Sequence, residues 1–461
     1  MLKSFNKEYK KYLYCLDREN DFKEFPSIAC AKEEMPQKDY DKVLKITEKA
    51  TYQAMEAFIH NMCSLNSRAG SQVPFSSINF GLETSIEGRM VVEQYLKAHI
   101  AGLGRGETSI FPIAIYTLKK GINFNPEDPN YDLFRLAMEC SSKRQFPTYA
   151  FVDSSFNLPY YEKDNIRGVI SYMGCRTRVV SNVNGEETPV GRGNLSFATI
   201  NLPYLALEAK GNLDKFMSLL DKYLEITAKG LLERYDVQRH MKVKNFPFLM
   251  GQHLYYNSDH LGPEDYVEDA IKNGTLSIGF IGLAETLLCL TGKHQGESEE
   301  SQKLGLEIIS HIRKYCDDKT AQTHLNFSCL GTPAETYCMR ARDAIVKRFG
   351  IVKNISDREY LTNSCHVPVW YNISFKKKME IEGAYHKYCN AGHIAYLEAD
   401  GDISQNLDAF EAMIHAMSDA DVGYGAVNVE LYECTICGAS WRGETHICPR
   451  CGRDEREPIE I

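Results

Sequence analysis

Four cysteines near the C-terminal end have the types and spacing of a metal site. Cys434 and Cys437 form one CxxC pair, and Cys448 and Cys451 form a second pair ten residues further on. Each pair turns tightly enough to direct two thiolates at one ion, and four thiolates complete a tetrahedral site. Because all four ligands come from protein, no position is left open for catalysis. The spacing predicts structural Zn²⁺; the alternative is four cysteines that share no function.

A single cysteine, Cys175, lies in the run Met173-Gly-Cys-Arg-Thr-Arg178, between an expected strand and a long polar loop. Arg176 and Arg178 would lower the pKa of a nearby thiol and would attract phosphate groups. Cys175 is therefore a candidate for chemistry. Eleven cysteines lie outside the C-terminal cluster, and on residue types alone one more buried cysteine is the favoured interpretation.

Two further signals are weaker. The run Gly191-Arg-Gly-Asn194 could bring backbone N–H groups to an anion, or it could be an ordinary turn. His366 and His393 could act as acid and base, although a lone histidine is more often structural.

Hydrophobic periodicity indicates the elements that position these residues. Apolar residues at every fourth position predict one helix from Ile46 to Met62 and another from Leu213 to Leu231. Strands are expected at 73–80, 110–116, 148–152 and 197–202, with a further strand ending near 170–173. Strands that alternate with long helices predict an α/β fold. We expect a loose lead-in at 1–36, one α/β domain at 37–430 and a small cysteine module at 431–461.

Composition narrows the class of protein. The 461 residues are 43% hydrophobic and 25% charged, with a net charge of -9, which argues against a general binder of nucleic acid or of membrane surfaces. Acidic residues around the cysteine pairs favour a structural site over a DNA reader; they are Glu444, Asp454, Glu455 and Glu457. The longest apolar stretch, 276–290, is too short to span a bilayer. Scattered thiols behind a charged N-terminal segment predict a cytoplasmic protein.

Taken together and in order, the motifs resemble those of the anaerobic (class III) ribonucleoside-triphosphate reductases. The resemblance covers residues 37 to 455. The segments that carry it are Ser67–Asn79, Asn123–Pro126, Met173–Arg178, Gly191–Pro203, Ser277–Glu285, Gly331–Glu335 and the four cysteines. It implies a ten-stranded α/β barrel, here partial, around a central finger loop, with a small zinc-ribbon-like module that holds its ion by four cysteines.

The resemblance also implies a reaction. Members of this family reduce ribonucleoside triphosphates to deoxyribonucleoside triphosphates for DNA synthesis. A glycyl radical, made by a separate radical S-adenosylmethionine activating enzyme, oxidises the finger-loop cysteine to a thiyl radical. That radical takes the ribose 3′ hydrogen, and formate is the reductant in many members. The residues implied as catalytic are Cys175, Met173 and Asn194, and those implied at the substrate are Arg176, Thr332, Ala334 and Glu335.

The chain departs from the family pattern at both ends. We expect the radical glycine to lie outside this sequence, and Gly423-Tyr-Gly425 precedes the metal cysteines and does not replace it. The first barrel strand and its second active-site cysteine are not visible, since Cys15 and Cys30 lack that context. A split subunit completed by a separate chain and a fragment of a longer protein remain alternatives. A homodimer is expected from the family; the rival function is a non-catalytic nucleotide-binding or scaffold protein.

Overall fold

The computed structural model describes residues 1–66, 73–104, 106–163, 165–399, 401–429, 432–441 and 445–454. The beginning of the family-like segment at 67–79 and three of the acidic residues near the cysteines, Glu444, Glu455 and Glu457, lie outside the described residues. The chain forms two compact units. The first unit contains residues 1–150, 396–414 and 426–461, and the second contains residues 151–395 and 415–425.

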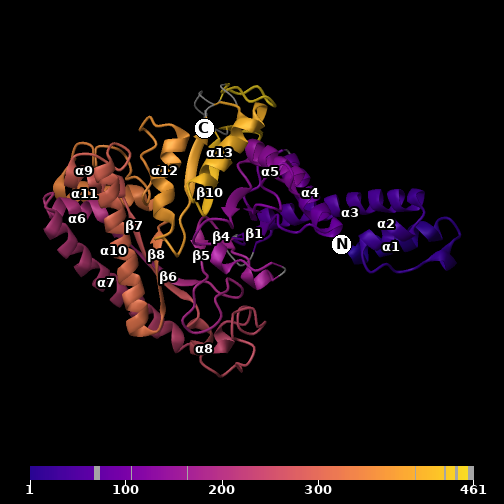
Figure 1. The fold of residues 1–461 in the computed structure, drawn as a ribbon, viewed down its shortest axis with the longest axis horizontal. Helices are drawn as coiled ribbons and strands as arrows, with labels where there is room; N and C mark the ends of the chain where they lie inside the picture. The colour runs from indigo at the N-terminus through magenta and orange to yellow at the C-terminus, as the bar shows by residue number, and fades with distance from the viewer. Residues whose placement is uncertain are drawn as a thin grey trace. The chain divides into compact units, whose positions relative to one another are not determined.

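The N-terminal residues of the first unit are helical and have their own small core (Figure 1). Phe5, Tyr9 and Leu13 are buried at four-residue spacing and pack with Tyr40 and Val43. The expectation of a loose lead-in at 1–36 is therefore wrong, because Phe5, Tyr9 and Leu13 form one buried face of a helix. The helices are α1 (Leu2–Tyr14), α2 (Ile28–Glu34), α3 (Gln37–Ser64), α4 (Ile86–Ala101) and α5 (Tyr131–Arg144), with the 3-10 turn η1 (Glu19–Asp21).

The sheet of the first unit has the strand order β1-β2-β3-β10-β9. Its strands are β1 (Ser77–Phe80), β2 (Ile113–Leu118), β3 (Thr148–Phe151), β9 (Ala395–Ala399) and β10 (Tyr424–Val429), with α13 (Leu407–Asp419) and η5 (Ile403–Gln405) between the last two. The strand predicted at 148–152 is confirmed. The strand predicted at 110–116 begins only at Ile113 and continues to Leu118, and the one predicted at 73–80 is strand only from Ser77 onward.

The second unit is built on a parallel three-stranded sheet, β6 (Asn194–Asn201), β7 (Thr275–Ile281) and β8 (Asn326–Gly331), in that order. One face is apolar and packs on the helices, through residues such as Ile278, Phe280 and Phe327. On the opposite face, Thr275, Ser277 and Gly279 of β7 are small. The Ser277 and Ser328 Oγ atoms share a hydrogen bond of 3.0 Å between β7 and β8. The sheet therefore presents a polar face opposite its helices.

Helices cover the apolar face (Figure 1). They include the predicted amphipathic helix, which is confirmed as α7. The helices of this unit are α6 (Leu202–Glu208), α7 (Leu213–Arg239), α8 (Glu268–Ile271), α9 (Leu283–Thr291), α10 (Glu299–Thr323), α11 (Tyr337–Phe349) and α12 (Phe375–His386), with 3-10 turns η2 (Leu158–Tyr160), η3 (Ile166–Gly168) and η4 (Val243–Asn245). Among the described residues, none of the helices has both the length and the apolar character needed to cross a membrane.

Candidate functional site

Cys175 lies at the tip of a short antiparallel hairpin in the second unit. Strands β4 (Tyr172–Met173) and β5 (Thr177–Arg178) pair Met173 with Thr177, which leaves Cys175 in a three-residue tip. The thiol is half-buried. Burial raises the pKa of Cys175 and Glu335 raises it further, against the opposing charge of Arg176. At neutral pH the group is therefore a thiol, not the thiolate that its arginine neighbours suggested, and a thiol is the form that exchanges hydrogen atoms.

Arg176 fixes this tip to a distant part of the unit. Its side chain is buried, with the residue only 4% exposed. The Nη1 atom has two hydrogens, which four acceptors within hydrogen-bond distance share: Gly331 O at 3.4 Å, Thr332 O at 3.2 Å, Asn363 Oδ1 at 3.4 Å and Ser364 Oγ at 3.2 Å. The guanidinium therefore joins the cysteine hairpin to the end of β8 and to the 363–364 segment.

The turn from Thr332 to Glu335 connects β8 to α11. Thr332 and Ala334 are buried, and Glu335 is exposed. Among the described residues, no acceptor takes the backbone N–H groups of Ala334 and Glu335, which lie just before the first turn of α11. Free N–H groups at the N-terminal end of a 13-residue helix are a favourable place for phosphate oxygens.

Thr332 is also held from the polar face of the sheet. Its Oγ1 atom shares a hydrogen bond of 3.1 Å with Thr199 Oγ1 of β6. Gly279 of β7 lies between the two threonines, and a Cβ atom at Gly279 would overlap Thr332 Oγ1. The sequence motifs did not single out Thr199 or Gly279. Small residues alternate with apolar ones along β7, which indicates a crowded face of a sheet, but the sequence does not show which strands pair with β7.

The predicted catalytic residues are not all brought together. Met173 is half-buried, two residues before Cys175. Asn194 begins β6 and is level with Thr275, at the strand end opposite the Thr332 turn, and its Oδ1 accepts from Ser196 N at 3.1 Å. Along these parallel strands the offset from Asn194 to the level of Thr332 is about 20 Å. The ribose-orienting role of Asn194 stays a prediction.

The two histidines lie in a buried cluster, which favours the structural interpretation. His366 Nδ1 lies 3.1 Å from Glu382 Oε2, and His393 Nε2 lies 3.3 Å from Cys365 Sγ. Burial lowers the pKa of His393 well below its usual value, with added effects from His386, His366 and Arg176. A neutral, buried His393 packs beneath the end of β8 and does not act as a surface acid.

The four C-terminal cysteines form the predicted cluster, in the first unit. The Sγ atoms of Cys434, Cys437, Cys448 and Cys451 all lie within 4.8 Å of one another. Each pair ends in a glycine with left-handed backbone, Gly438 (φ 69°) and Gly452 (φ 75°), a conformation that other residues adopt at a cost.

The two cysteine turns repeat the same hydrogen bonds. Gly438 N donates to Cys434 O, and Gly452 N to Cys448 O, both at 2.9 Å. The N–H groups of Cys437 and Cys451 donate to the first sulfur of their own pair, at 3.5 and 3.4 Å. Burial opposes ionisation of Cys448, but N–H groups of Cys451 and Arg450 stabilise the thiolate and lower its pKa to about 6. Four convergent sulfurs with N–H donors fit a bound metal ion. Outside this cluster, β11 (Tyr432–Glu433) pairs with β12 (Ser440–Trp441).

Comparison with solved structures defines the class of this fold. The chain is similar to a glycyl radical enzyme from Archaeoglobus fulgidus, with a TM-score of 0.53, 12% identity, and coverage of 77% of this chain and 51% of that one. It is also similar to the anaerobic ribonucleotide reductase from Thermotoga maritima, with a TM-score of 0.64, 16% identity, and coverage of 98% and 74%. The fold is that of the glycyl radical enzymes, and the predicted α/β barrel class with a finger loop is confirmed.

The chain belongs to the anaerobic ribonucleoside-triphosphate reductase family, whose family model matches residues 18–461. It is 33% identical over 431 residues to the anaerobic ribonucleoside-triphosphate reductase of Escherichia coli (strain K12). That match covers 90% of this chain and 58% of the relative. The chain thus spans somewhat more than half the length of that relative, and the predicted family is confirmed.

Proposed function

We propose that this chain carries the catalytic core of a reductase that converts ribonucleoside triphosphates to deoxyribonucleoside triphosphates. The observation that carries the proposal is the hydrogen bond that joins the Cys175 hairpin to the Thr332 turn through Arg176. This bond supports the proposal because it links the hairpin that carries Cys175 to the turn that we propose for phosphate binding. Family membership supports the reaction, and the name of the Escherichia coli relative supports the substrate class.

In this proposal Cys175 accepts and returns a hydrogen atom. As a thiyl radical its sulfur takes the hydrogen from C3′ of the ribose, so that an S–H bond forms as the C–H bond breaks. The 2′ hydroxyl then leaves as water, and formate or a thiol supplies the reducing electrons. A glycyl radical would supply the oxidant that this chemistry needs. The raised pKa of Cys175 supports the role, because it keeps the sulfur protonated between turnovers.

The remaining residues would bind and orient the substrate. Ala334 and Glu335 would offer backbone N–H groups to the phosphates, and Thr332 its hydroxyl. Arg176 would contribute positive charge from its buried position behind the turn. Met173 would line the site, and Asn194 would orient ribose hydroxyls as a neutral amide.

The metal of the cysteine cluster is proposed to be Zn²⁺. Four thiolates in a closed set suit Zn²⁺, which has no geometric preference from its d electrons and is not redox-active. Such a site would fold the C-terminal module and would take no part in the reaction.

The partners are proposed from the family alone. They are a radical S-adenosylmethionine activating enzyme, a second copy of the chain in a homodimer, and a separate chain that supplies the glycyl-radical segment. Reduction by the 461 residues and the activating enzyme, with no further chain, would contradict the last of these.

The test measures binding and reduction separately under anaerobic conditions. Equilibrium dialysis with a ribonucleoside triphosphate should show binding to the parent chain and to Cys175→Ser alike. Reduction in the reconstituted enzyme should fall more than about 10³-fold in Cys175→Ser and should persist in Cys289→Ser, whose thiol is also half-buried. Binding without reduction by the reconstituted parent would favour the scaffold alternative, and absence of binding would overturn the proposal.

A further inference from the structure

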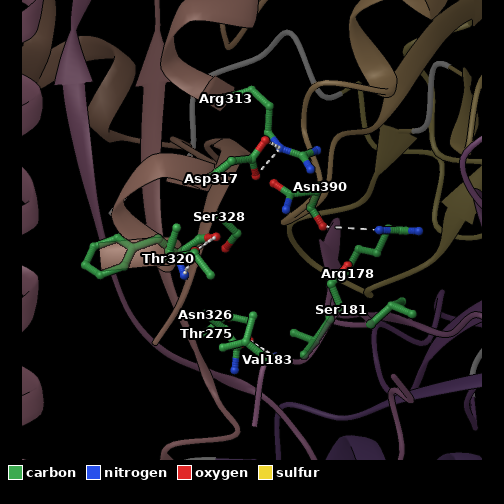
Figure 2. A pocket seen from close by; sticks show the side chains of 14 residues that line it. Arg178, Ser181, Val183, Thr275, Arg313, Asp317, Thr320, Asn326, Ser328 and Asn390 are labelled. Atoms are coloured by element: carbon green, nitrogen blue, oxygen red, sulfur yellow. Dashed lines mark hydrogen bonds and ion pairs between the residues drawn. The ribbon is translucent and has the colours of Figure 1, made fainter. Parts of the chain in front are cut away.

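A cavity of about 300 Å³ lies in the second unit, at the amino-terminal ends of β7 and β8 (Figure 2). Thr275 and Asn326, the first residues of these strands, form its floor. Six residue steps lead from Asn326 along β8 to Thr332, which is about 20 Å. None of the residues proposed for substrate or catalysis lines it. The cavity therefore lies at the strand end opposite the Thr332 turn, beside Asn194, whose Cα pairs with that of Thr275. Its volume is at the lower end of the range for small-molecule pockets.

One wall carries a cation with unused hydrogen-bond donors. Arg313 of α10 donates from Nε to both carboxylate oxygens of Asp317, at 2.8 and 3.0 Å. Within the described part of the chain, no acceptor is bonded to the two terminal nitrogens of Arg313. Both residues line the cavity, together with Thr320 one turn further along the helix. Arg313 is thus oriented by its helix neighbour and keeps its terminal N–H groups available.

A second donor, the side chain of Asn390, lies next to Arg313 in Figure 2. Asn390 Oδ1 accepts from Cys329 N at 2.9 Å, and this bond determines which way the amide faces. The Nδ2 group of Asn390 is therefore free to donate to a ligand, because none of the described residues accepts a hydrogen bond from it. The bond to β8 holds Asn390 in place independently of any ligand.

The Asp317 carboxylate offsets the charge of Arg313 on the cavity wall, so the net positive charge of the lining comes from Arg178. Arg178, Arg313 and Asp317 are the only ionisable side chains among the described residues that line it. All three nitrogens of the Arg178 guanidinium already have protein acceptors. Nε donates to Asn157 Oδ1 and Nη2 to Phe156 O, each at 2.9 Å, and Nη1 donates to the backbone oxygen of Asn390 at 3.4 Å. Burial lowers the pKa of Arg178, and the charge of Arg313 lowers it further. Valine side chains complete the walls, from Val179, Val180 and Val183.

We propose that this cavity binds a small oxyanion, through the terminal nitrogens of Arg313 and the Nδ2 group of Asn390. Two fixed donors, one of them charged, match the two oxygens of a carboxylate or of a phosphoryl group. The apolar walls accommodate a short carbon chain on the ligand. This site is independent of the proposed reductase function and would remain if that proposal failed.

The test is isothermal titration calorimetry of the whole chain with sodium acetate and, separately, with inorganic phosphate at fixed ionic strength. We expect saturable binding of at least one probe. Acetate alone would identify a carboxylate site, and phosphate alone a phosphoryl site. Asn390→Asp keeps the acceptor for Cys329 N but replaces the donor with negative charge, so binding should weaken at least about tenfold.

Arg313→Gln should weaken binding by a similar factor. The matched control is Arg348→Gln, which removes an arginine on α11 that is 61% exposed and is not among the cavity walls. Unchanged binding in Asn390→Asp and Arg313→Gln, equal weakening in Arg348→Gln, or no binding of either probe by the parent would overturn the proposal. Thermal melts of all variants identify any loss that reflects unfolding.

Discussion

Arg176 donates to the carbonyl oxygen of Thr332 at 3.2 Å, across 156 positions of sequence. The hairpin that carries Cys175 is therefore bonded to the turn before α11 by a charged group that is itself buried. A buried guanidinium is costly to remove, because a buried acceptor that is left without a donor cannot bond water instead.

Arg176→Met should destabilise the chain by about 3 kcal/mol, because an apolar side chain of similar length removes the charged donor from this dry site. The Ser364 hydroxyl lies 3.3 Å from Thr332 O and 2.8 Å from Asn363 Oδ1, and its single hydrogen can replace only part of what is lost. Arg176→Lys keeps the charge, so its loss of folding stability should be less than half that of Arg176→Met. Urea unfolding measures the stability, and the rate of iodoacetamide labelling of Cys175 measures the anchoring of the tip. The labelling rate of Cys175 should rise in both variants, and it should rise more in Arg176→Met than in Arg176→Lys.

The control for this pair is Arg348→Met, on an exposed face of α11, which should change stability by no more than about 0.5 kcal/mol. If Arg176→Met labelled Cys175 at the parent rate, the guanidinium would not be what holds the hairpin.

Gly279→Ala should destabilise the second unit by about 1–3 kcal/mol, since the new methyl group would displace the Thr332 hydroxyl from Thr199. The matched control is Gly230→Ala in α7, where a Cβ meets nothing within 4 Å. Alanine is the better helix former there, so the control should gain up to about 1 kcal/mol.

A double-mutant cycle separates this overlap from a general strand effect. Gly279→Ala combined with Thr332→Ala should cost at least about 1 kcal/mol less than the sum of the two single changes, because the overlapping atom is gone. Additive costs would mean that the methyl group is accommodated elsewhere.

Local periodicity predicted the long helices well. In α7 the apolar residues at every fourth position, such as Phe216, Leu220 and Leu224, form the buried face. In α3 the apolar series that begins at Ile46 is only partly buried, and the buried face includes Val43 and Ile59. The same signal was present at Phe5, Tyr9 and Leu13, but a high density of charge between them concealed it. The two CxxC pairs could be predicted because each is a local turn that needs no other part of the fold.

The partners of Arg176 could not be predicted in the same way. Its acceptors lie at the end of β8 and in the 363–364 segment, which are more than 150 positions away in the sequence and meet the hairpin only in the folded unit. Two of the four acceptors are backbone carbonyls, which every residue type possesses. The residue types therefore indicated a positive charge near Cys175. They did not indicate that the guanidinium of Arg176 would bond acceptors of the protein itself.

Glu285 provides a pH-dependent prediction. It is buried in the first turn of α9, and its Oε1 accepts from Thr362 N at 2.7 Å and from Thr362 Oγ1 at 2.6 Å. Burial raises the pKa of Glu285, and the bonds from Thr362 only partly offset this. The favourable contribution of the protonated carboxyl is complete below the unfolded pKa of about 4.3 and is lost as the pH rises through the raised folded pKa.

Glu285→Gln keeps the acceptor for Thr362 without the charge. The variant should therefore melt higher than the parent at pH 8, and the difference should shrink toward zero as the pH falls to 4. Thermal melts across that range measure the effect. Glu264→Gln is the control of opposite sign, because Lys242 and Lys244 lower the pKa of exposed Glu264. A melting difference for Glu285→Gln that did not vary with pH would contradict the assignment.

The cysteine cluster should retain about one Zn²⁺ per chain after desalting, as measured by inductively coupled plasma mass spectrometry. Cys448→Ser should retain less than about a fifth as much Zn²⁺. The Sγ atom of Cys448 in the parent lies 3.6 Å from that of Cys437, and the three thiolates left in the variant would hold Zn²⁺ far less tightly. Cys15→Ser, which changes an exposed cysteine of the same unit, should keep the full amount.

Replacing the metal with Co²⁺ should give a sulfur-to-metal absorption band in the parent and in Cys15→Ser but not in Cys448→Ser. If Cys448→Ser kept its Zn²⁺, the ion would be held elsewhere, and the paired glycine turns at Gly438 and Gly452 would need another explanation.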